Sequence, residues 1–335
     1  MQIRLRTRKL IKYFIIYWII FFISRNAFTN DQALPHSAKL SLAPMIEQVT
    51  PSVVNISSQG EVQLKFNPLL NDPFFRRFFN FPGQTQKRRT QSLGSGVIVD
   101  STKGLIITNS HVVRGASEIQ VKLMDGRVLK GKLVGSDAET DIAVVQIPAK
   151  DLVSIPISNS DLLKVGDFVV AIGNPFGLGQ TVTSGIVSAL ARSGLGITGY
   201  EDLIQTDASI NPGNSGGALV DLDGKLVGIN TAIFSKNGGN IGIGFAIPTN
   251  MVQKVLAQLV QFGGVERGYF GAKFQNLDPQ LVDAFAFLKK KGAMVVKIVR
   301  GSPAEDGGLK VGDLITKAGG KIITSAADLR NQLGL

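Results

Sequence analysis

Three residues that together can activate a nucleophile lie far apart in this chain: His111, Asp141 and Ser215. The serine lies in the segment Gly213-Asn214-Ser215-Gly216-Gly217, which satisfies the G-x-S-x-G pattern of serine hydrolases. A histidine can take the proton of a serine hydroxyl, and a carboxylate can orient that histidine. The three residues could therefore carry out acyl transfer through a covalent acyl-enzyme.

The order of these residues separates two folds that share the serine pattern. In α/β-hydrolases the catalytic histidine follows the serine. This chain has two histidines, His36 and His111, and both precede Ser215. The order His, Asp, Ser is that of chymotrypsin-type proteases. We therefore predict a serine protease of chymotrypsin-like fold with His111, Asp141 and Ser215 as its catalytic triad.

The local sequence around each triad residue agrees with its expected role. His111 follows the segment Leu105-Ile106-Ile107-Thr108-Asn109-Ser110, so it is expected where a buried strand ends, and a purely structural histidine is the alternative. Asp141 opens an apolar strand at 142–145, where a carboxylate needs a hydrogen-bond donor such as His111 Nδ1. Asp137 and Asp207 are rival acids, but turn and loop roles explain them adequately.

The glycines around Ser215 let the main chain direct its N–H groups toward a reacting carbonyl. We expect an oxyanion hole formed by the N–H groups of Gly213 and Ser215, with Asn214 as a third candidate donor. A phosphate-binding loop is the rival interpretation of residues 213–217. That loop requires a following Lys-Ser or Lys-Thr pair, which is absent here.

The composition argues against several other classes of protein. The chain has no cysteine, which excludes disulfides, a thiolate nucleophile and cysteine-based metal sites, and its two histidines argue against a zinc hydrolase. We therefore expect no metal and no cofactor. The net charge of +11 suggests a nucleic-acid partner, but much of this positive charge lies near the N-terminus. The only other dense basic cluster, residues 87–89, is interpreted as a solvated loop, so no nucleic-acid partner is expected.

The N-terminus has the pattern of an export signal. Five basic residues occur within the first twelve, and an unbroken apolar and aromatic run follows from Tyr13 to Ile23. As a helix this run is too short to span a bilayer easily, so we predict a signal peptide over residues 1–27. Ala27 is the best candidate for the last residue removed, and an uncleaved membrane anchor is the alternative. Residues 28–44 are expected to form an N-terminal arm.

The strand patterns predict an all-β protein with two barrels and a second, smaller domain. A first series covers residues 52–58, 96–100, 105–108, 119–124, 128–134 and 142–147. A second covers residues 168–172, 181–189, 203–206, 218–221, 225–232 and 243–247. A helix over 250–261, capped by Thr249, ends a protease domain at 45–262, and residues 265–335 form the smaller unit.

Several long motifs in the expected order resemble the HtrA family of DegP- and DegQ-like periplasmic serine proteases. These motifs are 108–113, 140–144, 171–177 and 205–219. An insertion at 60–93 is similar to the long LA loop of that branch. The resemblance implies an ATP-independent endopeptidase and chaperone that acts on unfolded periplasmic proteins as a homotrimer or larger assembly. Membrane contact would come only through residues 1–27.

The resemblance also assigns roles to individual residues. It implies that Ile210, Ile233 and Phe234 line a small apolar S1 pocket that accepts Val, Ile or Ala, and that Arg192 is the arginine of a sensor loop. Residues 265–335 resemble a PDZ domain. Its carboxylate-binding loop would be formed by Tyr269, Phe270, Gly271 and Ala272.

The sequence ends at Leu335, just after the helix that borders a PDZ groove, which predicts an incomplete and marginally stable PDZ domain. Two alternatives to a degradative protease stay open at this point. One is an anchored regulatory protease, and the other is a chaperone without protease activity.

Overall fold

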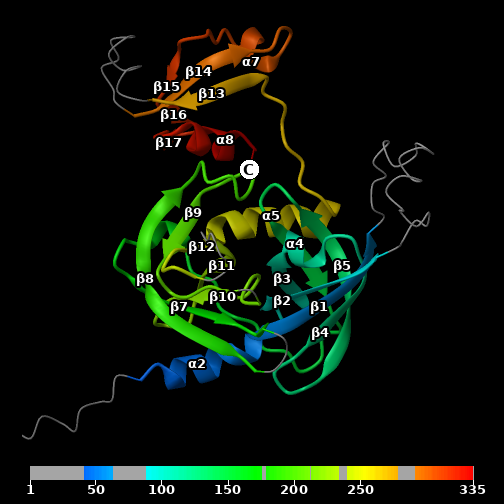
Figure 1. The fold of residues 1–335 in the computed structure, drawn as a ribbon. Coiled ribbons are helices and arrows are strands. Elements are labelled where there is room, and N and C mark those ends of the chain that lie inside the picture. The colour runs from blue at the N-terminus through cyan, green and yellow to red at the C-terminus, as the bar shows by residue number, and fades with distance from the viewer. Residues whose placement is uncertain are drawn as a thin grey trace, which may run out of the picture. The chain divides into compact units, whose positions relative to one another are not determined.

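The computed structural model describes residues 41–62, 88–175, 179–211, 213–233, 240–277 and 291–334. Residues 44–335 form one unit that contains both barrels and the C-terminal sheets (Figure 1). The predicted signal peptide at 1–27 lies outside the described residues, as does most of the predicted arm. The last two residues of that arm belong to the short helix α2 (Ala43–Val49), which is followed by η1 (Thr50–Ser52).

The first six strands close into an antiparallel barrel with the order β1-β2-β3-β6-β5-β4. Their bounds are β1 Val53–Val62, β2 Arg88–Asp100, β3 Leu105–Asn109, β4 Ala116–Lys122, β5 Val128–Asp137 and β6 Ile142–Gln146. Branched aliphatic residues fill its interior, including Ile56, Ile98, Ile106 and Val145, each at most 1% exposed. This barrel carries His111 and Asp141 at the ends of its strands.

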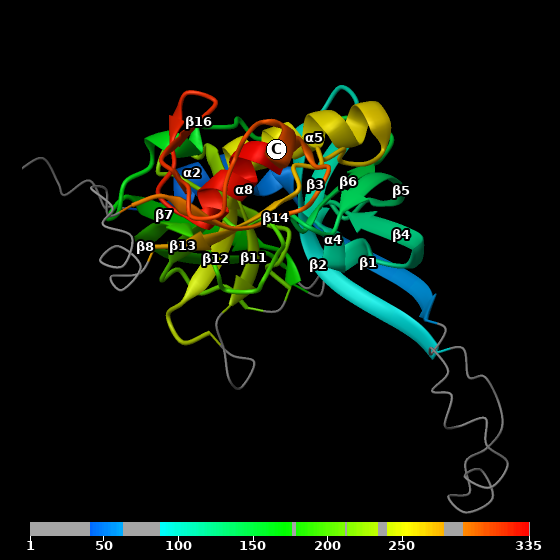
Figure 2. The same ribbon diagram turned by 90° about the horizontal axis from the view of Figure 1, so that it is seen from above.

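The second barrel repeats this design with the order β10-β11-β12-β9-β8-β7. Its strands are β7 Phe168–Gly173, β8 Thr181–Arg192, β9 Leu203–Thr206, β10 Ala218–Val220, β11 Leu226–Ile233 and β12 Gly244–Pro248. The two barrels lie side by side in the views of Figures 1 and 2. Together they confirm the predicted all-β, chymotrypsin-like double barrel.

The connections within the first barrel agree in part with the predictions. Asp125-Gly126 lies in the turn between β4 and β5, where Gly126 has a φ of +90°, a value that favours glycine. Strands β1 and β2 continue as a paired ladder to Val62 and Arg88, well into the range 60–93 predicted as a loop. The remainder of that range, residues 63–87, lies outside the described residues.

Helix α5 (Thr249–Phe262) follows the second barrel, as the apolar spacing predicts. Met251, Val255 and Leu259 are buried along one face, and Gly263 ends the helix with a φ of +73°. The predicted cap was wrong. Thr249 is the first helical residue, and its hydroxyl donates to the carbonyl of Ser158 at 2.7 Å instead of capping the helix.

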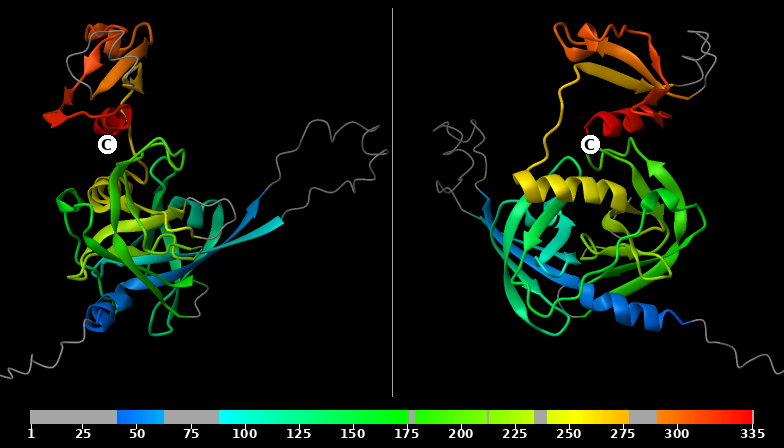
Figure 3. Two further views of the ribbon diagram at one scale, coloured as in Figure 1. Left: turned by 60° about the vertical axis from the view of Figure 1, so that its left-hand side comes forward. Right: turned by 180° about the vertical axis from the view of Figure 1, so that it is seen from behind.

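The C-terminal module follows α5 and contains two small sheets (Figure 3). Strands β13 (Ala272–Asn276), β14 (Ala293–Ile298) and β15 (Leu314–Ile315) form one sheet, with β13 at its edge. Strands β16 (Lys317–Ala318) and β17 (Lys321–Ile322) form the other. Helices α7 (Pro303–Asp306) and α8 (Ala326–Gly334) complete the module, and Leu329 of α8 packs against Ala293 and Ile323.

Candidate active site

His111 and Asp141 are brought together by the pairing of two neighbouring strands. The last pair of the β3–β6 ladder is Asn109 with Ile142, so the residues beyond it on each strand also lie side by side. The short helix α4 (Ser110–Val113) begins there and carries His111. The carbonyl of Asp141 accepts hydrogen bonds from Ser110 N–H at 3.0 Å and from Asn109 Nδ2 at 3.1 Å.

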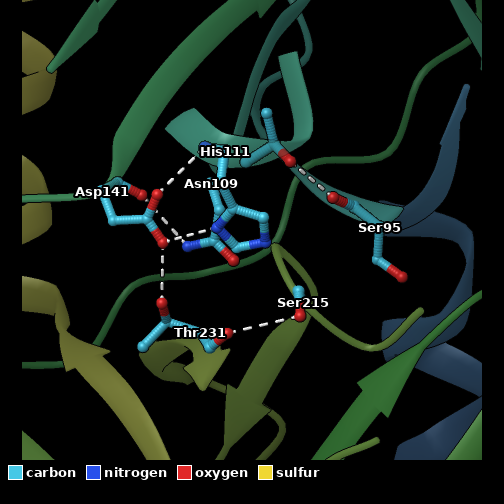
Figure 4. A network of polar contacts seen from close by, with 7 residues as sticks. Ser95, Asn109, His111, Asp141, Ser215 and Thr231 are labelled. Atoms are coloured by element: carbon cyan, nitrogen blue, oxygen red, sulfur yellow. Dashed lines mark hydrogen bonds and ion pairs between the residues drawn. The ribbon is translucent and has the colours of Figure 1, made fainter. Parts of the chain in front are cut away.

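The carboxylate of Asp141 is buried and accepts three hydrogen bonds (Figure 4). His111 Nδ1 lies 2.8 Å from Oδ2, and the main-chain N–H of His111 donates to Oδ1 at 3.0 Å. The hydroxyl of Thr231 in β11 also donates to Oδ2, at 2.8 Å. Asp141 has a φ of +57°, a backbone conformation that aspartate tolerates better than most residues. The carboxylate is therefore fixed against one edge of the imidazole ring, with which it can stabilise a positive charge.

Ser215 lies in the loop between β9 and β10 of the second barrel, on the other side of the site from Asp141. Its hydroxyl donates to the main-chain carbonyl of Thr231 at 3.3 Å. The same threonine thus contacts the acid through its side chain and the serine through its main chain. His111 has 42% of its side chain exposed, so solvent and substrate can reach the ring.

The loop before Ser215 is shaped by a second set of hydrogen bonds. Gly213 has a φ of +103°, which only glycine adopts readily. The N–H of Asn214 donates to the carbonyl of Asn211 at 3.0 Å, so in this arrangement it is not available to a substrate. The carbonyl of Asn214 accepts from Gly217 N–H at 2.9 Å. Of the three donors predicted for an oxyanion hole, the structure leaves Gly213 and Ser215 as the better candidates.

The two rival acids are engaged elsewhere. Asp137 accepts hydrogen bonds from Thr140 and from the guanidinium of Arg267, with Arg267 Nη1 2.9 Å from its Oδ1. Burial by itself would raise the pKa of Asp137, but the hydrogen bonds from Arg267 and Thr140 outweigh it and lower that pKa. Asp207 accepts from Ile186 N–H at 2.7 Å.

The predicted S1 residues are described only in part. Ile210 is 1% exposed, and its carbonyl accepts a hydrogen bond from Asn240 Nδ2 at 3.0 Å. A Cβ atom at Gly244 would lie 3.0 Å from Ile210 Cδ1, so a side chain there would press on Ile210. Ile233 ends β11, but its side chain lies outside the described part, as does all of Phe234.

The remaining predicted residues lie at the end of β8 and at the start of the C-terminal module. Arg192 ends β8, and its Nε donates to Gln205 Oε1 at 2.8 Å. Tyr269 is exposed, and Tyr269–Ala272 lead into the edge strand β13. The carbonyls of Phe270 and Gly271 accept from Ala304 and Val299 N–H at 3.0 and 2.8 Å. The phenyl rings of Phe270 and Phe274 are 6.0 Å apart.

Sequence reasoning missed two buried residues of this site, Thr231 and Ser95. Ser95 lies in β2 and donates its N–H to the carbonyl of Ser215 at 2.8 Å. Thr231 follows Asn230 within the otherwise apolar strand β11, and both are buried. Polar residues in an apolar strand need hydrogen-bond partners, and this is the signal that could have identified Thr231.

The described residues contain no group of three or more His, Cys, Asp or Glu residues arranged to bind a metal ion. Within the same part of the chain, no helix has the length and apolar character needed to cross a membrane.

Comparison with known proteins agrees with this geometry. A family model described as a trypsin-like peptidase domain matches residues 94–229, and one described as a PDZ domain matches residues 268–334. The periplasmic serine endoprotease DegP of Salmonella typhimurium is 47% identical over 328 residues, which cover 91% of this chain and 69% of that protein. The periplasmic pH-dependent serine endoprotease DegQ of Escherichia coli is 48% identical, and the match covers 88% of this chain and 64% of that protein.

Solved structures give the same result. One described as "HtrA-type protease AlgW with decapeptide" has a TM-score of 0.69 and 45% identity, and the match covers 88% of this chain and 90% of that one. Another, described as AlgW with tripeptide, has a TM-score of 0.72 and 42% identity, covering 88% of both chains. The chain therefore belongs to the HtrA family of DegP-like periplasmic serine endoproteases.

Proposed function

We propose that this endopeptidase degrades unfolded polypeptides in the periplasm through an acyl-enzyme on Ser215. The observation that carries this proposal is the contact of His111 Nδ1 with the buried Asp141 carboxylate at 2.8 Å, on the same site as Ser215. His111 takes the proton of Ser215 Oγ as that oxygen attacks the peptide carbonyl, and Asp141 stabilises the imidazolium that forms. His111 then returns the proton to the leaving amine, and water hydrolyses the ester.

The negative charge that develops on the carbonyl oxygen is held by the N–H groups of Gly213 and Ser215. Such donors contribute a few kcal/mol each when they are fixed before the reaction begins. For Ser215 to donate to His111, its hydroxyl must leave the carbonyl of Thr231, to which it is bonded in this structure.

The preference for substrates follows from two features. By resemblance to the family, Ile210, Ile233 and Phe234 line a small apolar S1 pocket, which favours cleavage after Val, Ile or Ala. Ile210 is 1% exposed in this structure, and a Cβ at Gly244 would lie 3.0 Å from it, so little space is left beside Ile210. The module that matches a PDZ domain has β13 at the edge of its sheet, where an extended peptide can add as a further strand next to Tyr269–Ala272. We propose that this module binds the C-termini of substrates and that Arg192 belongs to the loop that senses the bound peptide. We further propose that the chain acts as a homotrimer or larger assembly with chaperone activity.

The test is hydrolysis of casein, which lacks a stable fold, by the purified chain and by Ser215→Ala. We expect the wild type to cleave casein but not a stably folded protein, with the products ending in Val, Ile or Ala. The variant should retain its melting temperature and cleave neither. Equal cleavage by Ser215→Ala would refute the mechanism, while cleavage confined to one folded protein would refute the substrate class.

A further inference from the structure

Ser95 links the first barrel to the loop that carries the nucleophile of the second. It lies in β2 and is 0% exposed (Figure 4). Its hydroxyl donates to the carbonyl of Gly213 at 2.6 Å and accepts a hydrogen bond from Asn174 N–H at 2.7 Å. Its own N–H donates to the carbonyl of Ser215. One residue therefore holds the carbonyls on both sides of Asn214.

Ser95 contacts the two peptide groups on either side of the one that carries the Ser215 N–H. The group that joins Gly213 to Asn214 is held at its carbonyl by Ser95 Oγ and at its N–H by the carbonyl of Asn211. The next group, which ends in the N–H of Ser215, is held at its carbonyl by Gly217 N–H. Because a trans peptide is planar and its C=O and N–H point in opposite directions, fixing the carbonyl also fixes the N–H.

The loop needs such a restraint because glycines flank the nucleophile. Gly213 and Gly216 both have positive φ values, +103° and +83°. Glycine populates both halves of φ space readily, so these positions give the loop several orientations of similar energy. A hydrogen bond from a fully buried strand residue selects one of them. The Ser95 hydroxyl is itself held by Asn174 N–H, so it is oriented before substrate binds.

We propose that Ser95 is a positioning residue for the reaction, which holds the peptide groups before and after the one that carries the Ser215 N–H, so that this N–H faces the developing oxyanion. The inference rests on the acyl-transfer mechanism at Ser215 proposed above. Ser95 is buried and acts through Gly213 and Ser215, so its loss changes stabilisation of the transition state more than binding of the substrate. A serine that merely joined the barrels would instead affect stability without a selective effect on kcat.

The experiment compares Ser95→Ala with Ser160→Ala in the full chain. Ser160 is 6% exposed, and its hydroxyl also accepts a main-chain hydrogen bond, from Asn250 N–H at 3.1 Å, but in η3 (Ser160–Leu162) beside α5. For each variant kcat and KM are measured on a peptide with valine at the cleaved position, together with the inhibition constant of a matching peptide boronic acid. The boronate forms a tetrahedral adduct with Ser215, whereas a product-like peptide serves as a ground-state probe.

We expect Ser95→Ala to lower kcat by about 10- to 100-fold, somewhat less than the loss of an oxyanion donor itself. The boronate should bind more weakly by a similar factor, while KM and affinity for the product-like peptide change less than threefold. Ser160→Ala should keep the wild-type kcat, while its melting temperature falls by about as much as that of Ser95→Ala. A folded Ser95→Ala enzyme with kcat within threefold of wild type, or one in which kcat falls without weaker boronate binding, would overturn the proposal.

A second variant covers the case in which Ser95→Ala does not fold. Ser95→Cys replaces the hydroxyl by a thiol, which is a weak donor of similar shape, and should also show reduced kcat with unchanged KM. Wild-type kcat in the folded cysteine variant would refute the positioning role. If the wild type itself neither cleaves the peptide nor binds the boronate, then the acyl-transfer mechanism fails rather than the role of Ser95.

Discussion

Thr231 allows the contribution of the buried acid to be measured without removing the acid. Thr231→Val replaces the hydroxyl by a methyl group of similar size, and it removes one of the three hydrogen bonds on the Asp141 carboxylate. Hydrogen bonds to a charged acceptor contribute about 1.5–3 kcal/mol. If that contribution is realised fully in the transition state, kcat should fall by about 10- to 100-fold. The main-chain carbonyl that accepts from Ser215 is retained, so KM should hardly change.

The assay measures kcat and KM on the valine peptide, with Thr249→Val as the matched control. Thr249 is buried like Thr231, and its hydroxyl donates to the carbonyl of Ser158, which lies outside the site. A double-mutant cycle with Asp141→Asn tests whether Thr231 acts through the acid. In the Asp141→Asn background the valine substitution should have a much smaller effect. A folded Thr231→Val enzyme with kcat within threefold of wild type, or an undiminished effect in that background, would refute the reasoning.

Two further predictions concern stability rather than catalysis. Arg267→Met should destabilise the protein by about 3–5 kcal/mol in thermal or denaturant unfolding at pH 7, because it leaves the 7%-exposed Asp137 carboxylate without its cationic partner, although the hydrogen bonds from Thr140 stay. Because the pKa of Asp137 is lowered, the stabilisation from the Asp137–Arg267 ion pair is present above about pH 4 and is lost as pH falls further. Equal melting temperatures of the two proteins at pH 7 would contradict the prediction. Burial, followed by the charge of Asp328, raises the pKa of Asp202 to about 6, so the stabilising contribution of its neutral form is lost as pH rises through 6. Asp202→Asn should therefore be more stable than wild type at pH 7.5, by up to about 3 kcal/mol, but not at pH 4, and an equal gain at both values would show that the charge is not responsible.

The sequence predicted the features that depend on local pattern and residue order. Apolar strands placed His111 after β3 and Asp141 before β6, and the scarcity of histidine left one partner for Ser215. Contacts between distant segments were harder to foresee. Thr231 and Asp141 are 90 residues apart, and Ser95 and Gly213 are 118 apart. Their hydrogen bonds depend on how one barrel packs against the other, which no local spacing reveals.

The cap assigned to the last helix of the protease domain shows the same limit. Thr249 precedes a strongly apolar helical pattern and is a good capping residue by type. Its hydroxyl instead donates to the carbonyl of Ser158, 91 residues earlier, and the helix begins one residue sooner than predicted. A tertiary hydrogen bond here overrides a local preference.

The most direct test of the catalytic assignment is covalent labelling of the full chain with a fluorophosphonate, followed by mass spectrometry of its peptides. The account predicts one phosphonylated residue, Ser215, with labelling reduced strongly in His111→Ala and absent in Ser215→Ala. A label on another residue, or unchanged labelling in His111→Ala, would contradict the proposed triad.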